Sequence, residues 1–190
     1  KPQAAMVITE VGTGNIVAMA GGRDTHGQKL FNRATAPRQP GSAIKPLSVY
    51  AAALQRSYDL ASEGEPFPFK TFGFDTQGAT RWGKYLTAGS TVIDEAMYAR
   101  GELWPRNFSG GYSGYNTFRT ALQRSINTCA VKIALQVGPD YSMEMLKRLG
   151  ITTLADNAAE QYNDFNPAAM AMGAMVYGTT PLEMALAYAL

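Results

Sequence analysis

The first twenty residues contain two apolar, β-branched runs separated by polar turn residues. Residues 4–11 (AAMVITEV) and 16–20 (IVAMA) are typical of strands, and the turn residues 12–15 between them predict a β-hairpin. Two strands are only marginally stable alone, and no later segment has a comparable β-branched run. We therefore expect the other strands of this sheet to come from elsewhere.

Apolar residues at helical spacing dominate most of the remaining chain. They predict helices over residues 44–54, 118–137, 143–149, 167–178 and from 181 onward. The last of these starts at a capping box, Thr180-Pro181-Leu182-Glu183, with proline at the first helical position. The chain is therefore predicted to be largely helical outside the hairpin.

Residues 59–116 interrupt the helical pattern. They are rich in Gly, Pro and aromatic residues and show weak periodicity, with short helices expected near residues 92–98. A segment this long with little regular structure is typical of a binding surface, and a packed cover over the core is an equal alternative. In the first case Trp82, Trp104 and Tyr112 line a substrate cleft, and in the second they pack.

The composition excludes several classes of protein and site. The chain has 190 residues, 46% of them hydrophobic and 17% charged, so it is neither disordered nor fibrous. Its formal charge of +2 is too small for a nucleic-acid-binding surface, and no apolar run approaches the ~20 residues of a membrane span. The single Cys129 and the single His26 exclude a disulfide framework and a cysteine or histidine metal cluster. We expect Cys129 in the core and His26 in a loop.

A serine and a lysine three residues apart stand at the start of the first predicted helix. The turn residues Gln39-Pro40-Gly41 precede Ser42, and Lys45 follows one turn later. Unpaired N–H groups and the positive end of the helix dipole favour a negative charge that develops there. The spacing places the Lys45 amine within reach of the Ser42 hydroxyl. A lysine whose pKa is lowered by burial could remove the proton of that hydroxyl.

A structural interpretation of the same residues stays open. By spacing alone, a helix-capping serine beside a solvated lysine is the favoured explanation of Ser42 and Lys45. Pro46 complicates the geometry, because it cannot donate the first intrahelical hydrogen bond. We therefore expect either a cap at Ala43 or a distorted first turn.

A second polar motif, Ser125-Ile126-Asn127, falls inside the helix predicted over residues 118–137. Side chains two positions apart on a continuous helix point about 200° apart and cannot serve one site. The polar residues here compete for backbone hydrogen bonds, so the helix could break and restart from Cys129. Ser125 could then relay a proton and Asn127 could bind a substrate amide. Periodicity alone favours the alternative, one uninterrupted amphipathic helix.

Both motifs resemble those of a known enzyme superfamily. Residues 39–46 and 125–127 are similar to the first two signature motifs of the penicilloyl-serine transferases. Their setting resembles the transpeptidase domain of class A (bifunctional) penicillin-binding proteins. The likeness extends over nearly the whole chain, through residues 13–22, 32–35, 104–108, 110–114 and 178–185.

This resemblance implies a serine β-lactamase/transpeptidase-like fold of the α/β (α+β) class. A helical body would pack against an antiparallel sheet, of which only the N-terminal hairpin lies in this chain. The implied activity is a D,D-transpeptidase that cross-links peptidoglycan stem peptides through an acyl-enzyme and is acylated by β-lactam antibiotics. Ser42 would be the nucleophile, Lys45 the proton acceptor, Ser125 the proton shuttle and Asn127 the residue that holds the substrate amide. The family needs no metal or organic cofactor, and no nucleic acid is expected as a partner.

One part of the family's pattern is missing. The third motif, Lys-Thr-Gly or a close variant, and the strands around it do not occur in residues 1–190. We therefore expect residues 1–190 to be an incomplete transpeptidase domain. It would need a complementary segment, either on another polypeptide or in a continuation of this one. The family also implies a location on the extracytoplasmic face of the bacterial cell membrane, with the anchor outside this chain.

Two alternative functions follow from the same resemblance. A serine β-lactamase or D,D-carboxypeptidase of this superfamily would hydrolyse its acyl-enzyme rapidly. A non-catalytic β-lactam sensor domain would form the adduct without releasing D-Ala from a stem peptide. The lifetime of the acyl-enzyme and the release of D-Ala together distinguish the three.

Overall fold

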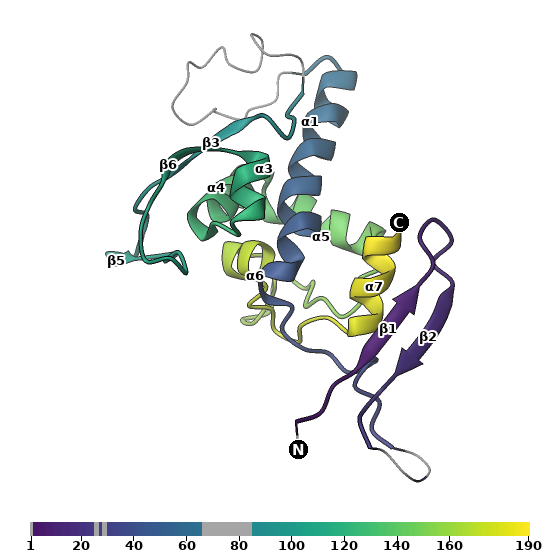
Figure 1. Cartoon of the computed structure of the whole chain (residues 1–190). Helices are drawn as coiled ribbons and strands as arrows, with labels where there is room; N and C mark the ends of the chain where they lie inside the picture. Colours follow the sequence, from purple (N-terminus) through teal and green to yellow (C-terminus); the bar gives the residue numbers. More distant parts are fainter. Residues whose placement is uncertain (1, 25–26, 28–29, 66–84) are drawn as a thin grey trace.

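The computed structural model describes residues 2–24, 27, 30–65 and 85–190. Its helices form one body, and the first two strands lie at the edge of that body beside the last helix (Figure 1). His26 and Trp82 lie outside the described residues. Among the described helices, none has the length and apolar character that a membrane span requires.

Short strands and helices follow one another along the described chain. In chain order they are β1 (Met6–Thr9), β2 (Ile16–Ala20), the 3₁₀ turn η1 (Gly41–Ile44), the π-helical segment η2 (Pro46–Ala51), α1 (Ala52–Ser62), β3 (Thr91–Asp94), β4 (Tyr98–Ala99), β5 (Glu102–Leu103), β6 (Gly114–Thr117), α3 (Phe118–Gln123), α4 (Asn127–Val137), α5 (Pro139–Arg148), α6 (Pro167–Met172) and α7 (Pro181–Ala189). The predicted capping box at the start of α7 is present.

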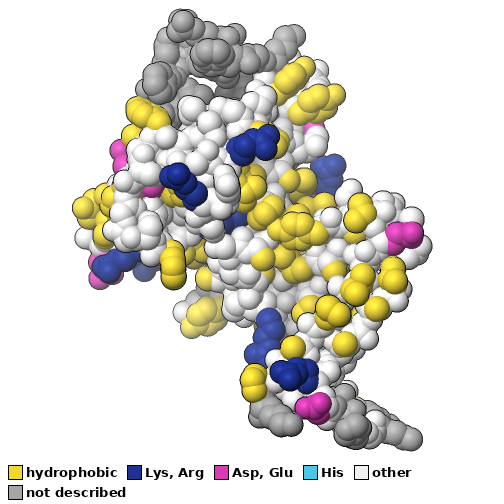
Figure 2. Space-filling view, in the orientation of Figure 1, with side chains coloured by type: hydrophobic (Ala, Val, Ile, Leu, Met, Phe, Trp, Pro, Cys, Tyr) yellow, Lys and Arg dark blue, Asp and Glu magenta, His cyan; other side chains and the backbone are white. Residues whose placement is uncertain are grey.

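The predicted N-terminal hairpin is also present, with β1 and β2 paired antiparallel. The hairpin is attached to α7: the Thr9 hydroxyl donates to the carbonyl oxygen of Ala185 at 3.2 Å, and the Gly12 N–H donates to that of Ala189 at 2.9 Å. Every residue of β2 is exposed, and apolar side chains gather on this part of the surface (Figure 2). Among the described strands, β2 pairs only with β1. The sheet therefore has an open edge.

The prediction of short helices near residues 92–98 is wrong. Thr91–Asp94 forms β3, which pairs antiparallel with β6, and β4 pairs with β5. The first three residues of β3 are β-branched, and such side chains lose more rotational freedom in a helix than on a pleated sheet. Val92 is fully buried in the core, which fixes the face that β3 presents. Residues 59–62, at the start of the segment predicted to be irregular, belong to α1 instead.

α4 lies at the centre of the hydrophobic core. Eight of its 11 residues are buried, including Cys129, whose predicted place in the core is confirmed. The cluster around α4 includes residues of η2, α1, β3, α3 and α6. A second buried cluster joins η1, η2, α5, α6 and α7. The turn that carries Ser42 and the segment that carries Ser125 therefore both lie against the same packed body.

The helix predicted over residues 167–178 is shorter than expected. α6 ends at Met172, and Gly173 follows with a φ of 66°, in the left-handed region. The chain turns there against η1: a Cβ atom on Gly173 would lie only 2.3 Å from the carbonyl oxygen of Gly41. Because Gly41 precedes Ser42, the absence of a side chain at position 173 sets how closely α6 approaches the predicted nucleophile.

Replacing Gly173 with alanine should therefore destabilise the chain. The left-handed conformation and the overlap with Gly41 together should lower the free energy of unfolding by at least about 2 kcal/mol, measured by urea titration with circular dichroism. Gly111→Ala is the matched control, because a Cβ atom there meets nothing within 4 Å. Equal stability of the two variants would contradict the close packing at Gly173.

Candidate active site

Ser42 lies in a distorted turn that leads into the first long helix. In η1 the Lys45 N–H donates to the carbonyl oxygen of Ser42, and the next six residues form the π-helical η2. Pro46 has no N–H and its ring clashes with a carbonyl one turn earlier, so a regular α-helical first turn is not available. The expected distortion is confirmed, whereas a cap at Ala43 is wrong, because the helical turn already begins at Gly41.

The segment before Ser42 is held by the C-terminal third of the chain. The side-chain amide of Gln39 pairs with both backbone groups of Met175, accepting from its N–H at 2.7 Å and donating to its carbonyl oxygen. Arg38 and Thr179 exchange two backbone hydrogen bonds, of 2.9 and 2.8 Å. These four bonds fix the turn from which the Ser42 side chain projects. None of the residues involved was predicted as part of the site, because the contacts span more than 130 positions.

The Lys45 amine is held by three oxygen atoms of the second motif. Its Nζ lies 2.9 Å from the carbonyl oxygen of Ser125, 3.1 Å from the Oγ of Ser125 and 2.6 Å from the Oδ1 of Asn127. An ammonium group has three N–H donors, and these acceptors match them. The structure therefore brings together three of the four predicted site residues.

Ser42 differs from Lys45 in its surroundings. Its residue surface is exposed, whereas only 1% of the surface of Lys45 is exposed. Among the described residues, no hydrogen bond joins the Ser42 hydroxyl to the Lys45 amine, and the amine's own bonds all go to the second motif. The hydroxyl thus stands at the surface, one turn before a buried amine.

Burial lowers the pKa of Lys45 from 10.5 to about 8, because the charged form loses its hydration water. A measurable fraction of the side chain is therefore uncharged near neutral pH. The uncharged amine keeps two N–H donors and gains a lone pair that can accept a proton from a hydroxyl. Lys45 is thus equipped to take up and return a proton inside a site made of neutral polar groups.

The helix predicted over residues 118–137 is broken at the second motif. α3 ends at Gln123, Ser125 has a φ of 53°, and α4 begins at Asn127. A positive φ is uncommon outside glycine and redirects the chain, so Ser125 and Asn127 both reach Lys45. The uninterrupted helix favoured by periodicity is therefore wrong. The alternative break is present, although the new helix starts at Asn127 instead of Cys129.

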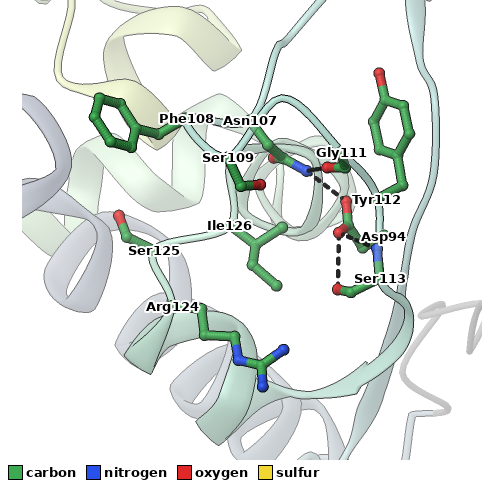
Figure 3. Close-up of a pocket in the computed structure, with 10 residues that line it drawn as sticks. All are labelled: Asp94, Asn107, Phe108, Ser109, Gly111, Tyr112, Ser113, Arg124, Ser125 and Ile126. Atoms are coloured by element: carbon green, nitrogen blue, oxygen red, sulfur yellow. Dashed lines mark hydrogen bonds between the residues drawn. The ribbon is translucent and has the colours of Figure 1, made fainter.

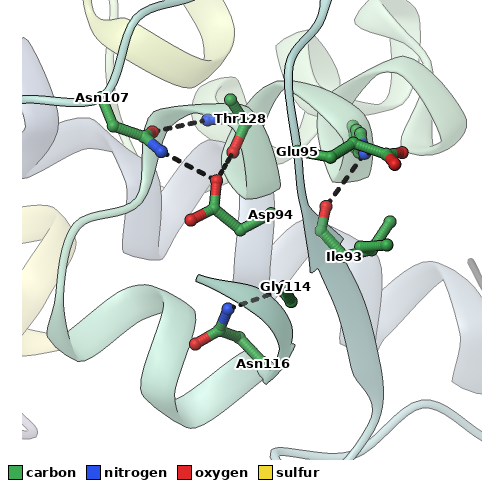
Figure 4. Close-up of polar contacts among 8 residues, drawn as sticks. Ile93, Asp94, Glu95, Asn107, Gly114, Asn116 and Thr128 are labelled. Carbon is green, nitrogen blue, oxygen red and sulfur yellow. Dashed lines mark hydrogen bonds and ion pairs between the residues drawn. The ribbon is translucent and has the colours of Figure 1, made fainter. Parts of the chain in front are cut away.

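A loop residue twenty positions earlier caps α4. Asn107 Oδ1 accepts from the backbone N–H groups of Asn127, at 3.0 Å, and Thr128, at 3.3 Å (Figure 4). The first N–H groups of a helix lack intrahelical acceptors, and no side chain at the start of α4 supplies one. Because the cap comes from elsewhere, the Asn127 side chain is available for Lys45 and for the carbonyl oxygen of Arg106, to which its Nδ2 donates at 2.7 Å.

A buried carboxylate in turn fixes Asn107. Asp94 accepts from the Nδ2 of Asn107 at 2.7 Å, from the N–H and hydroxyl of Ser113 at 2.7 and 2.9 Å, and from the Thr128 hydroxyl. Burial alone would raise the pKa of Asp94, but the hydrogen bonds from Thr128, Asn107 and Ser113 outweigh burial and lower it. Neither Asp94 nor Asn107 was predicted as a site residue. The available signal was the place of Asn107 within residues 104–108, which resemble the family.

A pocket of about 480 Å³ opens beside the second motif (Figure 3). It is lined by Asp94, Asn107, Phe108, Ser109, Gly111, Tyr112, Ser113, Arg124, Ser125 and Ile126. Tyr112 therefore lines a cleft, as one of the two interpretations predicted, whereas Trp104 is partly buried against the core. Within the described ranges, no group of three or more His, Cys, Asp and Glu residues could hold a metal ion.

The perturbed lysine should be visible by NMR. In protein labelled with ¹³C at the lysine side chains, we expect the Lys45 Cε signal to titrate near pH 8, with the ammonium form below and the amine above that value. A fully exposed lysine titrates near pH ~10.4. Lys45→Met identifies the signal by its loss. A Lys45 signal that titrates above pH 10 would show that the amine is hydrated and would remove the proposed proton acceptor.

Asp94→Asn should unfold at a lower urea concentration. The amide that replaces the carboxylate has an NH₂ group, which would face the donors of Asn107, Ser113 and Thr128. We therefore expect a loss of about 2–4 kcal/mol in the free energy of unfolding. Asp140→Asn, on the exposed first turn of α5, is the control and should lose less than about 1 kcal/mol. Similar losses in both variants would show that Asp94 does not support the loop.

Comparison with known proteins gives the family. The family model for the penicillin binding protein transpeptidase domain matches residues 84–190, more than half of the chain. Penicillin-binding protein 1A of Neisseria meningitidis serogroup A is 34% identical over 194 residues, covering 98% of this chain and 19% of the relative. Penicillin-binding protein 1A of Clostridium botulinum is 32% identical over 193 residues, covering 98% of this chain and 20% of the relative. The chain thus spans about a fifth of the length of these curated relatives.

Solved structures share the fold. Penicillin-binding protein 1A from Haemophilus influenzae has a TM-score of 0.66 at 29% identity, covering 98% of this chain and 23% of that chain. PonA1 from Mycobacterium tuberculosis, solved in complex with penicillin V, has a TM-score of 0.69 at 20% identity, covering 98% of this chain and 43% of that chain. This second match shows a likeness of fold. The expected fold class is confirmed. This chain belongs to the penicillin-binding protein transpeptidase family, and its relatives place it among the class A proteins.

Proposed function

We propose that this chain carries the acylation machinery of a D,D-transpeptidase that cross-links peptidoglycan stem peptides. The observation that supports this most directly is the buried Lys45 amine, which contacts Ser125 and Asn127 and lies one turn after the exposed Ser42. The relatives named penicillin-binding protein 1A support the class of reaction. The PonA1 structure, which holds penicillin V, shares the fold.

In the proposed reaction, Ser42 Oγ attacks the carbonyl carbon of the penultimate D-Ala of a stem peptide. The hydroxyl proton passes to the lone pair of Lys45, the C–N bond to the terminal D-Ala breaks, and the departing amine takes up a proton through Ser125. An amine of a neighbouring strand then attacks the ester and returns a proton to Ser42 as the acyl group leaves. A β-lactam would follow the first half only: its ring C–N bond opens and the ester stays on Ser42.

The contacts of the second motif support the roles given to its two polar residues. Ser125 Oγ lies 3.1 Å from the Lys45 amine, which is a distance for proton transfer between the two groups. Asn127 holds Lys45 with its Oδ1 and Arg106 with one N–H of its Nδ2. The second N–H of that Nδ2 is the donor proposed for a carbonyl oxygen of the substrate.

We further propose that a complementary segment completes the site. The open edge of β2 supports this, because unpaired strand edges are normally paired or covered in native proteins. Apolar side chains on β2, such as Val17 at 67% exposure, would be covered by the same segment. It would supply the third motif and the second donor to the oxyanion, either from a continuation of this chain or from another one. Peptidoglycan lies outside the cell membrane, so we propose that the protein acts at the extracytoplasmic face of that membrane.

Intact mass after incubation with a fluorescent penicillin tests the proposal. We expect the chain, with its complementary segment added, to gain the mass of one penicillin, and Ser42→Ala to gain none because it lacks the attacking oxygen. Ser62→Ala is the matched control and should be labelled like the parent, since the Ser62 hydroxyl is exposed and, among the described residues, donates to the carbonyl oxygen of Tyr58 alone. A full adduct on Ser42→Ala would overturn the assignment.

The lifetime of the adduct and the release of D-Ala separate the alternative functions. A one-to-one adduct that persists, together with release of D-Ala from a stem-peptide mimic, supports the transpeptidase. Rapid loss of the label with repeated turnover would instead indicate a β-lactamase or carboxypeptidase. A persistent adduct without any release of D-Ala would indicate a sensor domain.

A further inference from the structure

The pocket beside Ser125 has two walls of different origin. The junction of α3 and α4 provides Arg124, Ser125 and Ile126, and the loop between β5 and β6 provides the opposite wall (Figure 3). In this view, the Ser125 hydroxyl and the Arg124 guanidinium extend on different sides of Ile126. A ligand in this pocket would therefore lie against the second motif, next to the site proposed for acylation.

Most polar groups of the pocket are already engaged. Both oxygens of Asp94 accept hydrogen bonds, Asn107 caps α4 and donates to Asp94, and the Ser113 hydroxyl donates to Asp94 and accepts from Asn116 at 2.9 Å. The negative charge of Asp94 is thus satisfied within the protein. These groups shape the pocket but leave little capacity for a ligand.

Arg124 is different. It is exposed, and its guanidinium forms no hydrogen bond or ion pair with any residue that the structure describes. Its N–H donors form a planar fork that matches a carboxylate with two parallel hydrogen bonds. Because Asp94 is satisfied elsewhere, Arg124 is the unmatched charge of the pocket, and the ligand that it favours is an anion.

The rim of the pocket provides apolar contact area. Phe108 is fully exposed, and Tyr112 is 43% exposed. Both side chains are large aromatic rings, and covering them with a ligand would be energetically favourable. The loop that carries them is held by the hydrogen bonds of Asp94, so the loop backbone need not be ordered when a ligand binds. A peptide lying between the rings and Arg124 would cover this area.

We infer that the pocket is a binding subsite for a side-chain carboxylate of the peptide substrate, and that Arg124 determines this specificity. The inference rests on the proposed function, which supplies the peptide and places its reacting carbonyl at Ser42. The volume of about 480 Å³ falls in the range of small-ligand sites and accommodates a short peptide segment. Arg124 is a specificity-determining residue in this scheme and takes no part in bond making.

Binding of three matched peptides to Ser42→Ala, with the complementary segment added as in the acylation test, probes the subsite without acyl transfer. Acetyl-Glu-D-Ala-D-Ala and acetyl-Gln-D-Ala-D-Ala differ only in one side-chain charge, and the C-terminal amide of the first lacks the terminal carboxylate. Isothermal calorimetry should show the Glu peptide binding about tenfold more tightly than the Gln peptide. In Arg124→Gln this ratio should fall to near one, and in Arg124→Lys it should be intermediate, because lysine keeps the charge without the planar fork.

Arg119→Gln is the matched control, since Arg119 is an exposed residue of α3 that does not line the pocket. It should keep the tenfold ratio. The subsite would be overturned if Ser42→Ala bound the Glu and Gln peptides equally tightly or bound neither. An affinity ratio that Arg124→Gln leaves unchanged would also overturn it. If the Glu peptide instead loses affinity as its C-terminal amide, and Arg124→Gln removes that difference, Arg124 binds the terminal carboxylate and the side-chain assignment is wrong. A preference that depends on Arg124 in a protein that penicillin does not acylate would leave the subsite standing and refute the proposed function.

Discussion

The buried amine of Lys45 is the constraint on which the rest of the site depends. The shift of its pKa from 10.5 to about 8 corresponds to roughly 3 kcal/mol against the charged form. The chain compensates in part with three oxygen acceptors, and each of them requires an irregular backbone. Ser125 needs a positive φ to turn both its oxygens toward the amine, and Asn127 needs the first position of a new helix. The segment that carries Lys45 is irregular as well, because the π-helical η2 follows directly after it.

Buried carboxylates that accept hydrogen bonds from neutral N–H and O–H groups hold the irregular segments around the site. Asp94 fixes the loop that caps α4. Asp164 accepts from the backbone N–H groups of Ala155 and Val176 at 2.9 and 2.8 Å, and Glu183 accepts from those of Thr152 and Thr180, both at 2.8 Å. In each case one side chain satisfies several N–H or O–H groups of separate loops, which would otherwise be buried without partners. These loops include residues 175–180, which in turn hold the segment before Ser42.

The sequence could predict the parts of the site that are encoded locally. The hairpin, the capping box of α7 and the distorted turn at Pro46 each follow from a few adjacent residues. The two motifs could be found because their residue types and spacing resemble a family. Periodicity failed at the second motif, since an amphipathic pattern continues across Ser125 although the helix does not. The pattern of apolar residues records which face is buried, and it does not record a local reversal of the backbone.

The rest of the site depends on contacts between distant residues. The partners of Asp94 come from a loop and from α4, up to 34 positions away, and no local pattern marks them. Gly173 likewise lies against Gly41 at the end of α6, and this close approach of the two glycines is visible only in three dimensions. Residues 92–98 were wrongly expected to be helical because short β-branched segments have too few positions for periodicity to decide.

The attachment of the hairpin to α7 has a consequence for folding during synthesis. The bond between the Thr9 hydroxyl and Ala185 joins residues 176 positions apart, so β1 and β2 leave the ribosome long before α7, the described helix against which β1 packs. The hairpin is thus made before the helix that holds it and reaches that packing surface only when α7 emerges. The apolar side chains of β1 and β2 must stay soluble throughout that interval, which exposes this hairpin to premature association.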